Sequence, residues 1–371
     1  MNQPAYSEAR LFVIGFRQWK AYNLRPLLEA LFRKVVFVST PSALQSYQLN
    51  DHDYLAIWGM GKRNLLSELS AAYPQQKLLH IEDGFVRSVG LGSDLIRPCS
   101  LVLDSSGIYF DPTKPSGLEN ILNHHQFNKQ EMERAKQVQK FIVEHRITKY
   151  NIERQATPAW RTQAAAKAVI LVPGQVEDDA SIRYGCTAVN NNLALLQAAR
   201  EAHPDGFIVY KVHPDVLARN RRGKIDWEQV RHYADVIETE ISVDNCIHAC
   251  DVVHTMTSLT GFDALLRGKT VVTYGQPFYA GWGLTNDQGK SFPPERRVRK
   301  LTLDELTAAA LLLYPMYFDW QSRQFTTCET VLKMLLEQKK NIPHQHFWLR
   351  QCRKASVLLK AMVSESLKKL H

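Results

Sequence analysis

The sequence has no long hydrophobic run and few cysteines. Its longest apolar stretch, residues 308–318, is interrupted by Pro315 and is far shorter than the roughly 20 residues of a membrane-spanning helix. The first ten residues include Glu8 and Arg10 and lack the apolar core of a secretory signal peptide. Six cysteines in 371 residues make no disulfide framework. We therefore expect a cytoplasmic protein.

Negative charge is scarce at the C-terminal end. Residues 338–371 contain eight Lys and Arg residues and one acidic residue, Glu365, so this segment carries +7 of the formal net charge of +9. The preceding 337 residues are almost neutral. Because a dedicated nucleic-acid binder needs a basic folded body, we expect no nucleic-acid partner.

The same segment predicts a basic helical tail over residues 336–371. Apolar residues recur there at helical spacing, with Lys360 and Lys368 on the other side: Leu359, Met362, Val363, Leu367 and Leu370. Such a helix either packs on the folded body or lies on an anionic membrane surface. In the second case the protein would be peripheral on the inner face of the cytoplasmic membrane.

Strand-like and helix-like segments alternate along the first half of the chain. Strands are predicted at residues 11–16, 35–39, 54–58 and 77–81, and helices at 19–32, 64–73, 116–123 and 129–150. Residues 101–103 and 108–110 are typical of a hairpin around Ser105-Ser106-Gly107. The alternation predicts a parallel sheet covered on both faces.

A second alternation follows the candidate linker at residues 151–167. Strands are predicted at 168–172, 207–212, 251–254 and 270–274, and helices at 191–201, 261–267 and 303–313, the last with a capping box of Thr302 and Glu305. The fold class is therefore α/β, with two Rossmann-type domains, residues 1–160 and 161–335, that face a central cleft. Ligands of such sheets bind beyond the carboxyl ends of the strands, so the loops after strands are the candidate sites.

Two adjacent carboxylates, Glu82 and Asp83, follow the predicted strand at 77–81, with Arg87 nearby. Close carboxylates repel each other, so one retains a proton easily, which suits general acid and base catalysis. The alternative is an exposed turn in which Asp83 caps the next segment.

Three consecutive acids, Glu177, Asp178 and Asp179, lie in the first loop of the second half. Such a run can ligate a cation, supply a nucleophile or form a solvated loop. At this location a carboxylate can attack an electrophilic sugar carbon and form a covalent glycosyl intermediate.

Candidate phosphate-binding groups follow the next strands. Lys211 and His213 are two residues apart on a predicted strand that Pro214 ends, so their side chains point the same way. One fixed charge and one titratable donor suit a phosphate leaving group.

A further candidate site is the start of the predicted helix at Gly261. Thr257 and Ser258 precede this helix as N-cap residues, and the same geometry offers N–H groups to an anion. Asp263, inside the helix, is a candidate for binding ribose hydroxyls. The loop at residues 275–283 is rich in glycine and aromatic residues, which either border a sugar pocket or pack at a domain interface.

No metal site is expected. Cys246, His248, Cys250 and His254 have suggestive spacing, but positions two apart on a helix face different ways.

Six segments in order resemble the retaining β-Kdo glycosyltransferases of bacterial capsule biosynthesis, where Kdo is 3-deoxy-D-manno-oct-2-ulosonic acid. The segments are residues 82–92, 100–115, 179–185, 211–216, 257–269 and 274–285. The capsule-linker enzymes carry two such modules in tandem, whereas this chain has one. The resemblance is therefore to an isolated module, which favours addition of a single β-Kdo or of one linkage type.

The resemblance implies a GT-B-like fold, CMP-β-Kdo as donor and no other cofactor. The donor would bind the domain at 161–335, because His213-Pro214 and Gln276-Pro277 match motifs that lie around CMP. Asp179 aligns with the nucleophile of the family.

The domain at 1–160 would bind the acceptor, a lipid-linked glycan or saccharide. Glu82 and Asp83 fall on a motif that faces the acceptor and helps with proton transfer, and Arg87 is expected to bind the Kdo carboxylate. Two alternatives stay open. One is a transferase that uses another CMP-sugar, such as CMP-sialic acid, and needs no nucleophile. The other is a non-catalytic, membrane-associated component of polysaccharide assembly.

Overall fold

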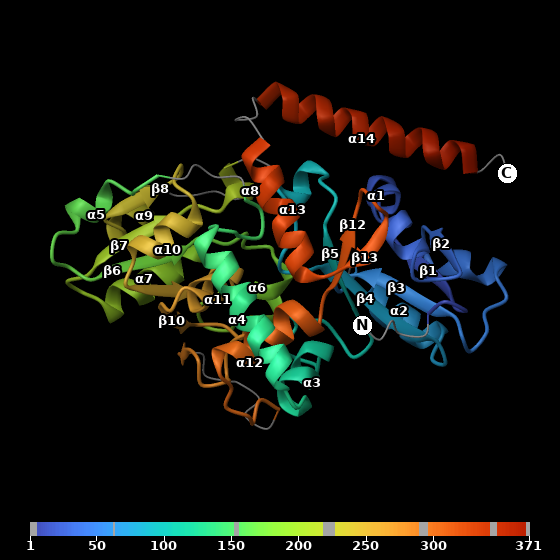
Figure 1. Cartoon of the computed structure of the whole chain (residues 1–371), viewed down its shortest axis with the longest axis horizontal. Helices are drawn as coiled ribbons and strands as arrows, with labels where there is room; N and C mark the ends of the chain where they lie inside the picture. The colour runs from blue at the N-terminus through green and yellow to red at the C-terminus, as the bar shows by residue number, and fades with distance from the viewer. Residues whose placement is uncertain are drawn as a thin grey trace. The chain divides into compact units, whose positions relative to one another are not determined.

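The computed structural model describes residues 6–61, 64–151, 156–217, 227–288, 296–341 and 347–368 (Figure 1). The chain divides into two compact units. Unit 1 consists of Met1–Ile108 together with Pro315–His371, and unit 2 consists of Tyr109–Tyr314. Each unit has its own sheet, so the predicted α/β chain with two Rossmann-type sheets is confirmed.

The sheet of unit 1 has seven strands in the order β13-β12-β5-β4-β3-β1-β2. They are β1 (Arg10–Ile14), β2 (Lys34–Val38), β3 (Tyr54–Trp58), β4 (Lys77–Asp83), β5 (Ser100–Asp104), β12 (Met316–Asp319) and β13 (Gln324–Thr326). The first four strands pair in parallel, and β5, β12 and β13 add antiparallel pairs. The sheet is therefore mixed, whereas the sequence predicts a parallel one.

Alternation along β1 explains why helices cover both faces of this sheet. Leu11 and Val13 pack against α1 (Gln18–Glu29), whereas Phe12 and Ile14 pack against η1 (Pro41–Ser46) and α2 (Leu65–Ala72). Successive side chains of a strand point to opposite faces, so one strand supplies both cores.

The predicted hairpin at residues 101–110 is wrong. Residues 101–103 belong to β5, but residues 108–110 form no strand, and β5 pairs with β4 and β12 instead. A carboxylate oxygen of Asp104 accepts hydrogen bonds from the backbone N–H groups of Ser106 and Gly107, which turns the chain away at the end of β5.

The C-terminal helices belong to unit 1. They are α13 (Cys328–Asn341) and α14 (Phe347–Lys368), and the 3-10 turn η2 (Gly92–Asp94) lies in the same unit. α14 packs on α1, Ala361 is buried, and Nζ of Lys354 lies 2.8 Å from a carboxylate oxygen of Asp94. The predicted tail helix is present, although the side chains of Leu367 and Lys368, and all of Leu370, lie outside the described residues.

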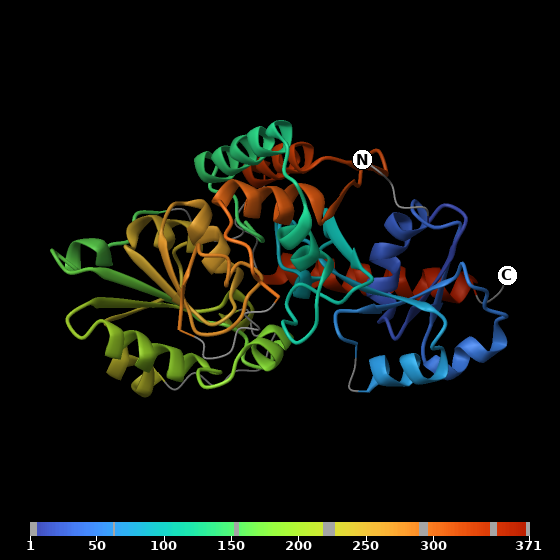
Figure 2. The same ribbon diagram turned by 90° about the horizontal axis from the view of Figure 1, so that it is seen from below.

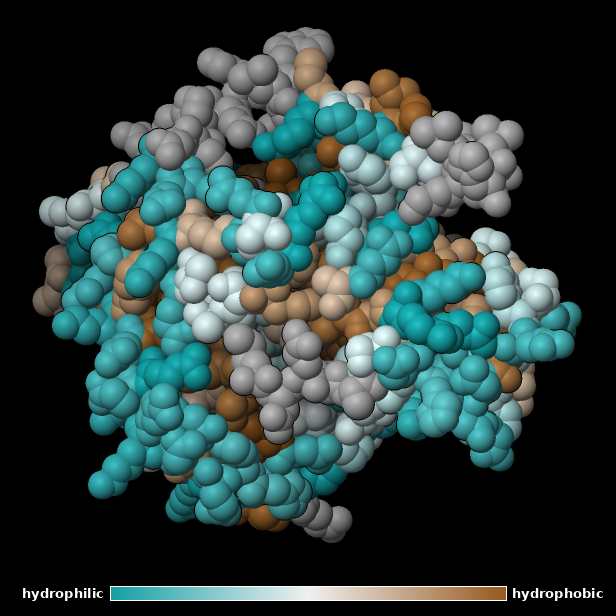
Figure 3. All heavy atoms as spheres, turned by 45° about the vertical axis from the view of Figure 1, so that its right-hand side comes forward, coloured by the Kyte–Doolittle hydropathy of each residue, from teal (hydrophilic) through white to brown (hydrophobic). Residues whose placement is uncertain are grey.

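One face of α14 stays apolar and exposed. Leu358, Leu359, Met362 and Val363 have exposed fractions of 44–60%. Apolar atoms are visible in brown at the top of the space-filling view, where α14 runs (Figure 3). Within the described ranges, no helix is both long and apolar enough for a membrane span.

The sheet of unit 2 has six parallel strands in the order β11-β10-β9-β6-β7-β8. They are β6 (Val169–Pro173), β7 (Phe207–Lys211), β8 (Val236–Glu238), β9 (Val252–Thr255), β10 (Thr270–Thr273) and β11 (Asn286–Asp287). α7 (Asn192–Ala202) packs on one face, and α10 (Val243–Ala249) and α11 (Leu259–Leu266) contact the same strands from the other (Figure 2).

Further helices complete unit 2. They are α3 (Gly117–His124), α4 (Lys129–Glu144), α5 (Trp160–Gln163), α6 (Ala180–Gly185), α8 (Pro214–Leu217), α9 (Trp227–Tyr233), α12 (Leu303–Thr307) and the π-helix η3 (Ala308–Leu313). The predicted capping box of Thr302 and Glu305 is present at α12.

The units divide the chain at other points than the predicted domains at 1–160 and 161–335. Residues 109–151 belong to unit 2 because α4 packs on α12 and η3. The chain then returns to the first sheet at β12. Residues 152–155 of the predicted linker lie outside the described residues.

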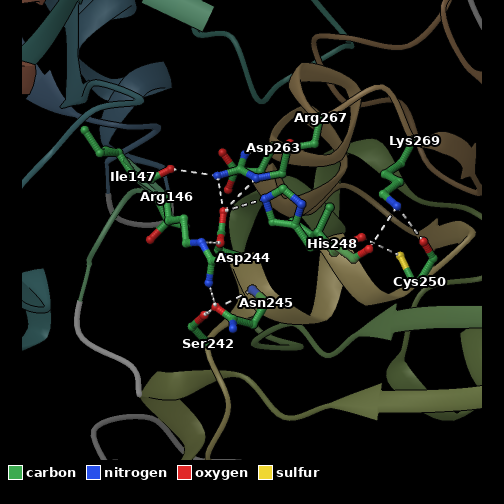
Figure 4. Close-up of polar contacts among 12 residues, drawn as sticks. Arg146, Ile147, Ser242, Asp244, Asn245, His248, Cys250, Asp263, Arg267 and Lys269 are labelled. Carbon is green, nitrogen blue, oxygen red and sulfur yellow. Dashed lines mark hydrogen bonds and ion pairs between the residues drawn. The ribbon is translucent and has the colours of Figure 1, made fainter. Parts of the chain in front are cut away.

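A buried ion cluster joins α10 and α11 in unit 2 (Figure 4). The guanidinium of Arg267 donates to a carboxylate oxygen of Asp244 from Nε at 2.8 Å and to the carbonyl of Ile147 at 3.0 Å. Both charged side chains are fully buried. Arg146 and His248 lie 3.9 and 3.8 Å from the same carboxylate. Asp244 thus lies between arginines from two other segments of the unit, while burial lowers the pKa of His248 and favours its neutral form.

Replacing Arg267 by Met should destabilise unit 2 strongly, because it removes the buried partner of the Asp244 carboxylate. We expect the free energy of unfolding to fall by about 3–5 kcal/mol, measured by urea denaturation. Lys140→Met is the matched control, since it breaks an exposed pair with Glu144 and should cost less than about 0.5 kcal/mol. Equal, small effects of both substitutions would contradict the structural role of the cluster.

Candidate functional site

Loops that follow β6, β9 and β10 meet at the carboxyl edge of the sheet in unit 2. Oγ1 of Thr257, after β9, donates to Oγ of Ser181, after β6, at 3.0 Å. The backbone N–H of Gln276, after β10, donates to the carbonyl of Gly185 at 2.8 Å. The structure therefore brings together the predicted segments around Asp179, Thr257 and Gln276.

Asp179 is the N-cap of α6. Its Oδ1 accepts from both the backbone N–H and the hydroxyl of Ser181, at 2.9 and 2.8 Å. Glu177 points elsewhere, because its carboxylate accepts from the backbone and side-chain amides of Asn192. The acidic run is thus not one cluster, and Asp179 is the member that contacts the loop after β9 through Ser181.

Lys211 is the last residue of β7, and His213 follows the strand. The strand ends at Lys211, which is buried, whereas His213 is half-buried and precedes α8 at Pro214. The backbone N–H of Asp215 donates to Nδ1 of His213 at 3.1 Å. With Nδ1 as acceptor, the proton of a neutral ring sits on Nε2, which is then a donor.

The start of α11 has the predicted N-cap. Oγ of Ser258 accepts from the N–H of Thr260, and Oε1 of Gln175 accepts from the N–H of Thr257 at 2.9 Å. A Cβ at Gly261 would overlap Oη of Tyr279, which donates to the carbonyl of Ser258. Glycine at position 261 is thus required by packing, and its predicted role in donor binding stays a prediction.

Asp263 faces the buried ion cluster of Arg267 and Asp244 (Figure 4). Burial raises the pKa of this carboxyl to about 6, and Arg267 opposes the shift. Asp263 is therefore buried beside the charged residues of the ion cluster. The predicted contact of Asp263 with ribose stays a prediction. The aromatic loop after β10 is also interior, since Phe278, Tyr279 and Trp282 are buried.

In unit 1, Glu82 and Asp83 are the last two residues of β4, and the loop after them folds around Arg87. This guanidinium is buried and donates from Nε to Asp83 at 2.7 Å, from Nη1 to Ser88 and from Nη2 to the carbonyl of Ile96. A Cβ at position 92 would lie 2.7 Å from Nη2 of Arg87, so Gly92 leaves room for the guanidinium. The expected contact of Arg87 with a sugar carboxylate stays a prediction, and it would have to add to these bonds or replace them.

The sequence reasoning missed Lys20, in α1. Its Nζ lies 3.3 Å from the centroid of the Trp58 ring, and Trp58 ends β3, next to β4. Burial lowers the pKa of Lys20 to about 8, while Glu82 and Asp83 favour its charged form. The sequence did hold one indication of this part of the site, because Trp58 lies at the carboxyl end of a predicted strand beside the strand that ends near Glu82. No local pattern, however, pairs residue 58 with residue 20.

A family model described as capsule polysaccharide biosynthesis protein matches residues 55–317, which include every site residue predicted from the sequence. The chain belongs to this family. Among its relatives is the capsule polysaccharide modification protein LipA of Neisseria meningitidis serogroup B, 44% identical over 329 residues, which are 89% of this chain and 46% of LipA. The lipopolysaccharide-processing protein LpsZ of Rhizobium meliloti is 34% identical over 90% of this chain and 76% of LpsZ. The chain thus spans about half the length of the LipA proteins.

This member of the capsule polysaccharide biosynthesis family is also similar to two solved structures from Thermosulfurimonas dismutans. The KpsC β-Kdo 2,7 transferase is 34% identical with a TM-score of 0.72, over 89% of this chain and 99% of that one. The KpsC β-Kdo 2,4 transferase is 32% identical with a TM-score of 0.74, over 87% and 97%. The resemblance seen in the six motifs and the GT-B-like fold class are confirmed.

The lowered pKa of Lys20 predicts a pH-dependent contribution to stability. Between about pH 8 and 10.5 the unfolded chain holds a proton on Lys20 that the folded chain has released, so this residue makes stability rise with pH. The melting temperature of the wild type minus that of Lys20→Met should therefore increase from pH 7 to pH 10. Lys140→Met, which removes an exposed lysine, should run parallel to the wild type. Parallel profiles for Lys20→Met would refute the shift.

Proposed function

We propose that this chain is a glycosyltransferase that moves Kdo from CMP-β-Kdo to a glycan or glycolipid acceptor of a bacterial surface polysaccharide, with retention at the anomeric carbon. The observation that carries the proposal is the similarity of nearly the whole chain to two solved β-Kdo transferases. The meeting of the loops after β6, β9 and β10 supports it, because Asp179, the proposed nucleophile, and the start of α11, the proposed phosphate site, lie there together.

In the first step, the carboxylate of Asp179 attacks the anomeric carbon of Kdo. The bond from this carbon to the phosphate oxygen breaks, CMP leaves with the electron pair, and a glycosyl-aspartate forms. Oδ1 of Asp179 already accepts two hydrogen bonds from Ser181, so we assign the attack to Oδ2.

The leaving phosphate is stabilised by Lys211, by Nε2–H of His213 and by the N–H groups at the start of α11. Gln276-Pro277 borders the CMP moiety. No metal or further cofactor is assigned a step, since these groups supply the positive charge that the phosphate needs.

In the second step, the acceptor hydroxyl attacks the same carbon from the opposite side and Asp179 departs, which restores the original configuration. The proton of the hydroxyl passes to Glu82 or Asp83. The Kdo carboxylate binds Arg87.

Replacing Asp179 by Ala should reduce Kdo transfer at least about a thousand-fold while CMP still binds, because the variant lacks the nucleophile. Intact mass spectrometry of the wild type with CMP-Kdo should show one Kdo adduct on Asp179. Asp178→Ala is the matched control in the acidic run and should keep the adduct.

Three results would contradict this assignment. Near-normal turnover of Asp179→Ala would exclude it as the nucleophile. An inverted product would favour an enzyme of the type that uses CMP-sialic acid without a nucleophile. A wild-type chain that binds CMP but never transfers Kdo to any acceptor would favour a non-catalytic assembly component.

We also propose that α14 lies on an anionic membrane surface. Its exposed Leu358, Leu359, Met362 and Val363 are apolar, and the segment 338–371 carries +7, which complements anionic headgroups. Another face of α14 packs on α1. The helix can therefore pack on unit 1 and contact a membrane surface at the same time.

Truncation after Lys340, or the double substitution Leu359→Glu with Met362→Glu, should abolish co-sedimentation with phosphatidylglycerol vesicles. Activity on a soluble acceptor should survive the double substitution. Lys140→Glu, an equivalent charge change on unit 2, should leave partitioning intact. Unchanged partitioning of the double variant would remove the proposal.

A further inference from the structure

We infer that Gln175 is a positioning residue that orients the carboxylate of Asp179 through the hydroxyls of Thr257 and Ser181. The inference rests on the proposed function, in which Asp179 is the nucleophile, and extends it to a side chain that contacts neither the donor nor the reacting atoms.

Both polar atoms of the Gln175 side-chain amide form hydrogen bonds with Thr257. Nε2 donates to Oγ1 of Thr257 at 3.1 Å, and Oε1 accepts from the backbone N–H of Thr257 at 2.9 Å. Gln175 is buried, with 7% of its surface exposed. The two bonds fix Thr257 at both its backbone and its hydroxyl. A turned amide would lose the bond from the N–H of Thr257 and could only accept a hydrogen bond from its hydroxyl.

The hydroxyl protons then have one direction. Because Oγ1 of Thr257 accepts from Gln175, its own proton is donated to Oγ of Ser181 at 3.0 Å. Oγ of Ser181 accepts this proton and donates its own to Oδ1 of Asp179 at 2.8 Å. The relay begins at an amide donor and ends at a carboxylate acceptor, and every hydrogen bond within it reinforces the next.

Gln175 is itself held by Asn192 at the start of α7. The N–H of Gln175 donates to Oδ1 of Asn192 at 2.8 Å, and Nδ2 of Asn192 donates back to the carbonyl of Gln175 at 2.9 Å. A Cβ at position 174 would lie 2.6 Å from Oη of Tyr210, so Gly174 lets the loop approach β7 closely. The relay therefore starts from a fixed point of the scaffold.

Gln175 is connected to both the proposed nucleophile and the proposed phosphate site. The amide that starts the relay to Asp179 also binds the N–H of Thr257, at the start of α11, where the leaving phosphate is proposed to bind. Gln175 thus fixes the distance between nucleophile and phosphate site. A misplacement of about 1 Å at such a site costs on the order of a hundred-fold in rate.

The test compares Gln175→Glu with the wild type in single-turnover formation of the Kdo adduct on Asp179. Glutamate keeps the acceptor for the N–H of Thr257 but cannot donate to its hydroxyl, so the relay loses its direction. We expect adduct formation to slow by about 10- to 100-fold, with CMP affinity within about twofold of the wild type.

Gln139→Glu is the matched control. It makes the same chemical change in the same unit, at an amide that donates to the carbonyl of Leu266 at 2.8 Å, at the far end of α11. It should leave the rate of adduct formation unchanged. A loss of rate in Gln175→Glu that Gln139→Glu shares, or a proportional loss of CMP affinity, would mean a general disturbance of unit 2 and would overturn the inference.

A crystallographic comparison of wild type and Gln175→Glu does not depend on transfer. The carboxylate of Asp179 should turn away from Ser181 or occupy more than one rotamer in the variant. An Asp179 carboxylate in its original orientation overturns the positioning role, whatever the reaction. A wild type that forms no adduct but shows the reorientation would count against the proposed function alone.

Discussion

Parallel pairing of neighbouring strands in unit 2 is the constraint on which its candidate site depends. β6, β7, β9 and β10 run in one direction, so the chain leaves all four strands at the same edge and crosses back over a face of the sheet. The helices that cross back bury the sheet, and the polar loops are left at the edge. Contacts such as Gln276 to Gly185 then fix those loops against each other. The geometry that makes the core therefore also assembles the site from distant segments.

Buried arginines stabilise loops in both units, whereas one lysine has a pKa that lies closer to neutral pH. Arg87, in unit 1, and Arg267, in unit 2, each bind one carboxylate and at least one carbonyl, which the planar guanidinium can do at once. Arg297 does the same with Glu119 and the carbonyl of Pro277, next to Gln276. Lys20 differs, because burial lowers its pKa to about 8, far nearer to neutral pH than that of an arginine. The fixed charge of the arginines supports the loops, and the titratable charge of Lys20 lies beside Trp58 at the end of β3.

The sequence predicted the features that local patterns determine. β3 has the predicted limits, and the loops with Asp179 and Thr257 do meet, because alternation and turn residues report on strands and on where they end. The antiparallel pairing of β5 with β12 was missed, since nothing near β5 reveals a partner from the other end of the chain. The same reason hid Lys20 beside Trp58 and the burial of Arg87. Local sequence shows that a charge is present, and only tertiary packing shows what it faces.

The discontinuity of unit 1 has a consequence for how the protein is made. β12 covers the outer edge of β5, but all of unit 2 is synthesised between these strands. While the ribosome is still translating unit 2, β5 has an open edge whose N–H and C=O groups lack their final partners. Unit 2 is a continuous segment and can fold as it emerges, whereas unit 1 can close its sheet only after all of unit 2 has been synthesised. The newborn chain is therefore exposed to intermolecular strand pairing at β5, and it is protected only once β12 has docked.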